Sequence, residues 1–321
     1  MRASSTKRPR PAEKSLTAVL PLTEEVNAST RDLDVLDTPE LLHRINDEDR
    51  RVAWAVEREI DVIATAVDAI TQCLKDGGKL HYFGAGTSGR IGALDAAEIP
   101  PTFSAHDVVI AHIAGGPPAL LTAVEEAEDD EQAGRREVEE HRIGRGDAVI
   151  GISASGSAPY VVSALTASKA SGALTVALTN SPASQLAAAV DIPIELLTGP
   201  EVIAGSTRLK AGSAQKMALA MMSTAIMTKL GKVYGNLMVD VRPTNKKLRA
   251  RAERLTVLLS GAQPSDARSA LERSGYRVKL AVAMLACGLG VDEAEAALAR
   301  NGGNLRALLN AKPLSKKSAG R

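Results

Sequence analysis

Glu98 is the side chain in this sequence with the clearest potential for acid catalysis. It ends a segment of mostly small, apolar residues and precedes Pro100 and Pro101. A partly buried carboxylate near the C-terminal end of a helix has a raised pKa, because desolvation and the helix dipole both disfavour its charge. From an ordinary value of about 4.3, a rise of roughly two or three units would keep Glu98 protonated near pH 7, as a general acid requires. An exposed glutamate at a helix end is the alternative, and the pattern alone favours it.

A second group of carboxylates forms a run further along the chain: Glu125, Glu126, Glu128, Asp129 and Asp130. Such a run is usually a solvated helix face, and the pattern singles out none of its members. The five histidines show neither metal-ligand spacing nor a Ser-His-Asp order. Two of them, His81 and His112, fall in strand-like runs and are expected to be structural.

A glycine-rich segment, GAGTSGR at residues 84–90, is typical of a phosphate-binding turn. It follows an apolar run, and a helix is expected to begin at Ser88 and to stop before Pro100. Glycines let backbone N–H groups approach an anion, and a helix N-terminus adds about half a positive charge. Thr87 and Ser88 add hydroxyl groups. The glycines have dinucleotide-loop spacing without a nearby acidic partner, so a dinucleotide site and a plain helix cap both stay open.

Two further hydroxyl-rich loops are expected at the same edge of the molecule. They are ISASGSAP at residues 152–159 and GSTRLKAGSAQK at residues 205–216. Three such loops favour a hydroxylated, phosphorylated ligand, since each charge-assisted hydrogen bond to a phosphate contributes roughly 1.5–3 kcal/mol. Arg208 and Lys210 either add positive charge to this site or are solvated residues at a helix start.

The elements that must position these loops alternate between strand-like and helical patterns. This alternation predicts an α/β fold, a parallel sheet sandwiched by helices, in which the ligand site lies beyond the carboxyl ends of the strands. Strand-like runs end at Phe83 and occupy residues 108–113, 148–152, 174–178 and 192–196, with helical patterns near 118–142 and 159–170.

Helical segments are also expected before and after the sheet. One apolar stripe from Val52 to Leu74 predicts a single helix that Asp47 caps and Gly77 ends. A methionine-rich helix over residues 214–231 is expected in the core or at a dimer interface. Three short helices are expected between residues 261 and 309, as a small helical domain.

The composition excludes several classes of protein. The chain has 321 residues, 39 basic and 38 acidic, and 2% aromatic residues, which gives neither an overall charge nor stacking platforms for nucleic acid. No apolar run approaches the roughly 20 residues of a membrane span, and the N-terminus lacks a signal peptide pattern. Two distant cysteines, Cys73 and Cys287, suggest neither a disulfide framework nor a zinc cluster. We therefore expect a cytoplasmic protein without a metal.

Several long motifs closely resemble those of the N-acetylmuramic acid 6-phosphate etherases. They are INDEDRRVAWAVERE (45–59), YFGAGTSGRIGALDAAEIPPTF (82–103), AVEEAEDD (123–130), EVIAGSTRLKAGSAQK (201–216) and GKVYGNLMVDVRPTNKKL (231–248). The resemblance implies the sugar isomerase (SIS) fold. It also implies a disordered tail at 1–21, a catalytic domain at 22–248, a ubiquitin-associated-like helical domain at 249–312 and a tail at 313–321.

The resemblance also implies an activity. Members of this family release D-lactate from C3 of the phosphorylated amino sugar, as a step of cell-wall recycling, without a metal or redox cofactor. The glutamate of the family's Asp-Ala-Ser-Glu motif falls on Glu98, although Ala97 replaces the serine, and would be the proton donor. The glutamate of its Ala-Glu-Asp motif falls on Glu128, which would be the base. The sugar-phosphate contacts would come from Thr87, Ser88, Gly89, Ser153, Ser155, Gly156, Ser206 and Lys210.

Three expectations remain attached to this resemblance. A homodimer is expected, and a sugar-phosphate sensor or a phosphosugar isomerase is the alternative function. Ser157 and Ala158 stand where the family often has Arg-Thr, which predicts weaker phosphate binding or an altered substrate. If residues 88–98 form one helix, Glu98 lies about 15 Å from the phosphate loop, so it either serves a partner's site or is brought back by a break near Gly92.

Overall fold

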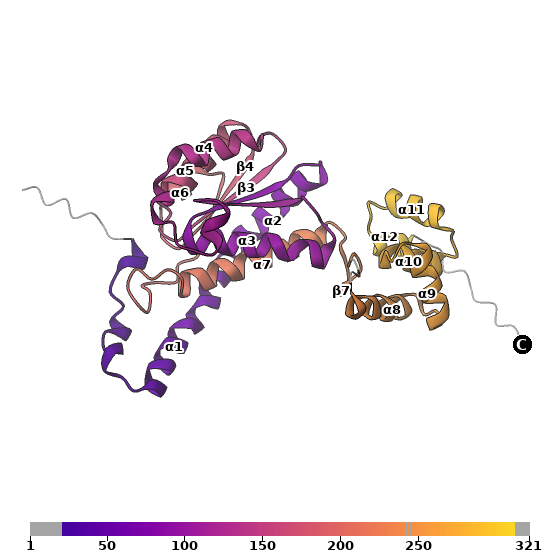
Figure 1. Cartoon of the computed structure of the whole chain (residues 1–321), viewed down its shortest axis with the longest axis horizontal. Coiled ribbons are helices and arrows are strands. Elements are labelled where there is room, and N and C mark those ends of the chain that lie inside the picture. The colour runs from indigo at the N-terminus through magenta and orange to yellow at the C-terminus, as the bar shows by residue number, and fades with distance from the viewer. Residues whose placement is uncertain (1–20, 242, 244, 312–321) are drawn as a thin grey trace, which may run out of the picture.

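The computed structural model describes residues 21–241, 243 and 245–311. Apart from Pro21, the tails expected at residues 1–21 and 313–321 lie outside the described part of the chain. Figure 1 shows a sheet unit with helices on both sides, connected to a smaller helical unit at the C-terminal end.

Five strands form one parallel sheet in the order β2-β1-β3-β4-β5. They are β1 (Leu80–Gly84), β2 (Val109–Ile113), β3 (Ala148–Ser153), β4 (Leu174–Thr179) and β5 (Ile192–Glu195). The register places Gly84 level with Ile113 on one side and Ile152 on the other. The predicted strands and the parallel sheet are thus confirmed, and the glycine-rich turn follows β1 at the carboxyl edge.

Helices cover both faces of this sheet because its strands are apolar on both sides. One face packs against α1 (Thr38–Glu57), α2 (Ile60–Lys75), α3 (Gly86–Phe103) and α7 (Lys210–Lys229). The other packs against α4 (Glu131–Glu140), α5 (Pro159–Ala170) and α6 (Gln185–Ala189). Successive residues of β1 alternate between the faces, so that Tyr82 belongs to the first core and Phe83 to the second.

The single helix expected from Val52 to Leu74 is two helices, and that prediction was wrong. Asp37, not Asp47, caps α1 by accepting from the Glu40 N–H, and the chain leaves the helix at Arg58 and Glu59. The break lets α1 pack along α7 while α2 packs on both α7 and β5. Figure 1 shows α1 extending well beyond the sheet.

The predicted stop before Pro100 was also wrong, because α3 continues through Pro100 and Pro101 to Phe103. The prolines remove N–H donors, but Ile99 and Phe103 of this last turn are buried beside Met227. Burial of these large side chains offsets the cost of proline in a helix. No break occurs at Gly92, so that alternative for Glu98 is excluded within this chain.

The segment 118–142 is helical only in its last part. It contains two 3-10 turns, η4 (Pro117–Leu120) and η5 (Glu125–Asp129), before α4 begins at Glu131. The acidic run therefore lies mainly in a turn of irregular backbone rather than on a helix face.

A small hairpin, β6 (Val233–Tyr234) and β7 (Leu237–Met238), leads to the C-terminal helical unit. This unit contains α8 (Lys246–Ser260), α9 (Pro264–Arg273), α10 (Val278–Cys287), α11 (Val291–Arg300) and α12 (Leu305–Asn310) around its own apolar core. Four helices lie between Gly261 and Ala311, the last described residue, where the sequence predicted three, because α12 is a separate short helix. Within the described residues, no helix has both the length and the apolar character needed to cross a bilayer, and no cluster of metal-ligating side chains occurs.

Candidate functional site

A cavity of about 330 Å³ lies at the carboxyl edge of the sheet, where β1 and β3 end. Its walls include five of the predicted site residues: Thr87, Ser88, Glu128, Ser153 and Ser155. Thr23, Glu24 and Thr207 line it as well, and sequence reasoning did not select them. Thr207 directly follows the selected Ser206, but nothing in the local sequence around Thr23 signals a site.

The hydroxyl groups of this cavity are partly engaged in hydrogen bonds within the protein. Ser88 Oγ donates to Gln215 Oε1 at 2.9 Å, so its proton is already used. Ser153 Oγ accepts from the Gly156 N–H at 3.1 Å, which leaves the hydroxyl proton of Ser153 available to a ligand. Ser155 and Ser157 share a hydrogen bond of 2.9 Å between their hydroxyls.

The predicted glycines lie beside the cavity and shape its loops. A Cβ on Gly89 would be 2.7 Å from the carbonyl oxygen of Gly84, so only glycine permits this close approach of α3 to β1. Gly156 has φ of +67°, and a Cβ there would be 2.2 Å from Ser184 Oγ. Both positions are therefore explained by backbone geometry.

The electrostatics of the cavity are unusual for an anion site. Among its described lining residues there is no lysine or arginine, and its two charged groups are the carboxylates of Glu24 and Glu128. The positive potential for a phosphate comes from the N-terminus of α3, which begins at Gly86 in the cavity wall. Burial raises the pKa of Glu128, and the neighbouring charge of Asp129 raises it further. A raised pKa makes the Glu128 carboxylate a stronger base.

Lys210 is not among the residues that line this cavity. Its Nζ lies 2.6 Å from Glu48 Oε2, and both side chains are at least 98% buried. Burial alone would raise the pKa of Glu48, but hydrogen bonds from Lys210, Ser29 and Asn27 outweigh it and lower that pKa to about 2. Lys210 therefore forms a buried ion pair in this structure, whereas Ser206 lies beside Thr207 in the loop that borders the cavity.

Glu98 lies elsewhere in the same chain. It is exposed, which is the alternative that the pattern alone favoured, and α3 runs on past it to Phe103, so the helix-end position expected from sequence was wrong. Glu98 lines a separate cavity of about 370 Å³ between α3 and α7, together with Ile91, Leu94, Asp95, Lys216 and Ala220. Exposed Leu94, Met217 and Met221 lie on the same pair of helices. This face is the α3/α7 face, and it combines the carboxylates of Glu98 and Asp95 with exposed apolar side chains.

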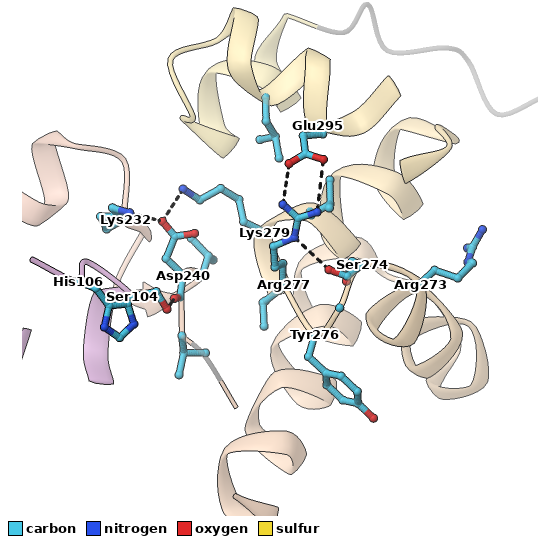
Figure 2. A pocket seen from close by; sticks show the side chains of 16 residues that line it. Ser104, His106, Lys232, Asp240, Arg273, Ser274, Tyr276, Arg277, Lys279 and Glu295 are labelled. Atoms are coloured by element: carbon cyan, nitrogen blue, oxygen red, sulfur yellow. Dashed lines mark hydrogen bonds and ion pairs between the residues drawn. The ribbon is translucent and has the colours of Figure 1, made fainter. Parts of the chain in front are cut away.

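A larger cavity, about 730 Å³, lies at the junction with the C-terminal unit and contains no predicted site residue. Figure 2 shows the lysines of this junction directed at Asp240, whose Oδ2 accepts from Lys279 Nζ at 2.8 Å and lies 3.3 Å from Lys232 Nζ. Arg277 pairs with Glu295 at 2.7 Å. The contacts of Asp240 with Lys232 and Lys279 connect the sheet unit to the C-terminal helical unit.

The two strand histidines, His81 and His112, belong to a buried chain of hydrogen bonds. His81 Nδ1 lies 3.0 Å from His112 Nε2, and His112 Nδ1 lies 2.9 Å from Glu137 Oε2, which also accepts from the Tyr160 hydroxyl. Burial, with a smaller effect of His112, lowers the pKa of His81 to about 4. These histidines belong to the core, as the sequence predicted.

Comparison with known families first defines the class of protein. The model of the SIS domain matches residues 134–225, and that of the glucokinase regulatory protein N-terminal SIS domain matches residues 62–169. The parallel five-stranded sheet with helices on both faces and with hydroxyl-bearing loops at its carboxyl edge is that of an SIS-domain protein.

The family follows from full-length relatives. An N-acetylmuramic acid 6-phosphate etherase of Rhizobium rhizogenes is 48% identical over 91% of this chain and 95% of its own length. One of Mycolicibacterium smegmatis is 49% identical over 90% of this chain and 97% of its own. A solved phosphoheptose isomerase of Neisseria gonorrhoeae covers 60% of this chain and 100% of its own, with 20% identity and a TM-score of 0.48. The chain belongs to the N-acetylmuramic acid 6-phosphate etherase family.

Proposed function

We propose that this protein cleaves the lactyl ether of N-acetylmuramic acid 6-phosphate, with water, to N-acetylglucosamine 6-phosphate and D-lactate. The observation that carries the proposal is the near 50% identity to etherases over about nine-tenths of the chain. The cavity adds support, because it combines a basic carboxylate with hydroxyls and a helix N-terminus suited to a sugar phosphate. These relatives favour the etherase over a sugar-phosphate sensor or an isomerase.

In the proposed mechanism, the Glu128 carboxylate removes the C2 proton of the open-chain aldehyde. The electron pair of that C–H bond forms the C2–C3 double bond as the bond from C3 to the lactyl oxygen breaks. The carboxylic acid of Glu98 gives its proton to the departing oxygen, so lactate leaves without a costly alkoxide. Water then adds at C3 and a proton returns to C2, which restores the saturated sugar and balances the reaction.

Glu98 is proposed to reach this reaction from a second copy of the chain in a homodimer. Two features support this: α3 is uninterrupted between Ser88 and Glu98, and the α3/α7 face exposes Leu94, Met217 and Met221. Exposed apolar side chains around a carboxylate suit an interface that places Glu98 of the partner subunit against Glu128. A cytoplasmic location completes the proposal, supported by the free thiols of Cys73 and Cys287.

The test is to incubate the protein with N-acetylmuramic acid 6-phosphate and to measure D-lactate together with deuterium exchange at C2. The proposal requires both, and it requires Glu128→Gln to abolish both. Exchange without lactate would indicate an isomerase. Substrate binding with neither signal would indicate a sensor and would refute the etherase.

A further inference from the structure

The N-terminal segment 22–35 packs on the loop that follows β5. This loop borders the cavity that contains Thr87, Ser88 and Glu128, which we call the phosphate cavity. This segment, the N-terminal arm, consists of η1 (Leu22–Glu24), η2 (Ala28–Thr30) and η3 (Leu33–Val35). The Gly205 N–H donates to the Thr23 carbonyl at 2.9 Å, and Thr30 Oγ1 donates to the Val202 carbonyl at 2.8 Å. Asn27 Nδ2 also donates to the Pro200 carbonyl at 3.2 Å, so the arm is bonded to the loop at three points.

Buried charges fix the arm in place. Asn27 Nδ2 donates to Glu48 Oε2 at 2.9 Å, and the same oxygen accepts from Lys210 Nζ at 2.6 Å. Ser29 Oγ donates to the other oxygen of Glu48 at 2.8 Å. Glu201, which is fully buried, accepts the first two N–H groups of α7 at 2.9 Å each. Because this network connects the arm, α1 and the start of α7, the arm is a rigid wall of the cavity.

Two side chains of the arm reach the cavity without partners of their own. The Thr23 hydroxyl is buried and has no hydrogen-bond partner among the described residues. The Glu24 carboxylate is exposed, and the structure gives it neither an ion pair nor a side-chain hydrogen bond within the described part of the chain. It lies directly over Gly205, where a Cβ would be 2.7 Å from Glu24 Oε2. A buried hydroxyl without a partner is costly, so a ligand that bonds it gains affinity.

We propose that Glu24, supported by Thr23, is the specificity-determining residue that binds the hydroxyl groups of the sugar. A carboxylate repels a phosphate dianion but accepts strong hydrogen bonds from sugar hydroxyls. The phosphate therefore occupies the side of the cavity formed by the start of α3 and by Ser153, and the hydroxylated carbon chain extends toward the arm. This role deepens the proposed function and rests on it for the identity of the sugar.

The test compares the binding of two ligands by calorimetry, which needs no turnover. The probes are N-acetylglucosamine 6-phosphate and inorganic phosphate. Glu24→Gln is expected to weaken binding of the sugar phosphate about tenfold or more, because a neutral amide is a weaker acceptor than a carboxylate. The same variant should bind inorganic phosphate as well as the wild type or better, since a repelling charge is gone. Glu25→Gln is the matched control, because Glu25 is exposed and outside the cavity wall, and it should change neither affinity.

A second variant keeps the shape of the arm. Thr23→Val removes only the hydroxyl without a partner, so the melting temperature should not fall while affinity for the sugar phosphate does. Unchanged affinity of Glu24→Gln for the sugar phosphate would overturn the proposal. An equal fall in affinity for the sugar phosphate and for inorganic phosphate would also overturn the proposal, because it would indicate a structural role for Glu24. Loss of kcat and of C2 exchange at unchanged affinity would make Glu24 a catalytic base instead. Absence of lactate release by the wild-type protein would refute the proposed etherase function, and this outcome is distinct from the binding results for Glu24.

Discussion

Two inactive variants, one changed at Glu98 and the other at Glu128, are expected to restore activity when they form a mixed dimer. Each single variant, Glu98→Gln or Glu128→Gln, keeps the size of the side chain and removes its proton chemistry. Each is expected to lower kcat by on the order of 10²–10⁴, the usual contribution of a general acid or base. Neither homodimer then has an intact site.

The length of α3 explains why mixing the two variants should restore activity. Ten residues of continuous helix separate Ser88 from Glu98 by about 15 Å, whereas a sphere with the volume of the phosphate cavity is about 9 Å across. Within one chain Glu128 and Glu98 line separate cavities, so the proposed site draws its two carboxylates from two chains. In a two-fold symmetric heterodimer of the two variants, one site has both glutamates intact and the other has neither, which predicts about half the wild-type kcat per heterodimer.

The assay is lactate release from heterodimers that carry two different affinity tags and are purified by both in sequence. A random equal mixture, in which about half of the dimers are mixed, should show about a quarter of wild-type activity. Purified heterodimers with no more activity than either parent would refute shared sites. A mixture of wild type and the double variant provides the control for subunit exchange.

Three further predictions concern stability and substrate affinity. Burial lowers the pKa of His81 to about 4 in the folded protein, so between about pH 6.5 and 4 the unfolded chain binds more protons at this residue than the folded protein does. The free energy of unfolding, measured by urea titration, should therefore fall by up to about 3 kcal/mol as the pH is lowered through that window. His81→Gln should flatten this slope, and an unchanged slope would assign it to other groups. Lys210→Met removes the buried cation of Glu48 and leaves it only the exposed Arg51, 3.4 Å away, so it should cost about 3 kcal/mol. The double variant with Glu48→Gln should recover part of this loss, and equal losses would contradict the ion pair as the cause. Ser157→Arg is expected to lower KM for the sugar phosphate by roughly tenfold without raising kcat, and an unchanged KM would show that position 157 does not contact phosphate.

The local sequence pattern was sufficient to predict the parallel sheet and the loops at its carboxyl edge. Apolar runs located the five strands of the parallel sheet but not the short hairpin of β6 and β7. Gly84, Thr87 and Ser88 mark the turn after β1, because close backbone approach needs glycine. Where helix boundaries depend on packing, the pattern failed. The prolines at 100 and 101 did not end α3, since burial of Ile99 and Phe103 outweighs their local effect.

The site itself depends on contacts that the local sequence does not record. Lys210 looked like a phosphate ligand because it lies in a hydroxyl-rich loop, but its ammonium pairs with Glu48, 162 positions earlier. Glu24 lies in an unremarkable acidic pair and reaches the cavity only because the arm is bonded to the loop around Gly205. The roles of Glu98 and Glu128 come from the family resemblance and stay predictions.

The unbroken course of α3 has a mechanical consequence. Its first turn borders the cavity of one subunit, while its outer face carries the carboxylate proposed for the other. In the proposed homodimer, a continuous helix transmits any tilt from end to end, so binding of a phosphoryl group at the first turn of α3 would also displace Glu98 at the site of the partner subunit. Turnover in the two halves of the dimer should then be coupled, with a Hill coefficient that departs from one.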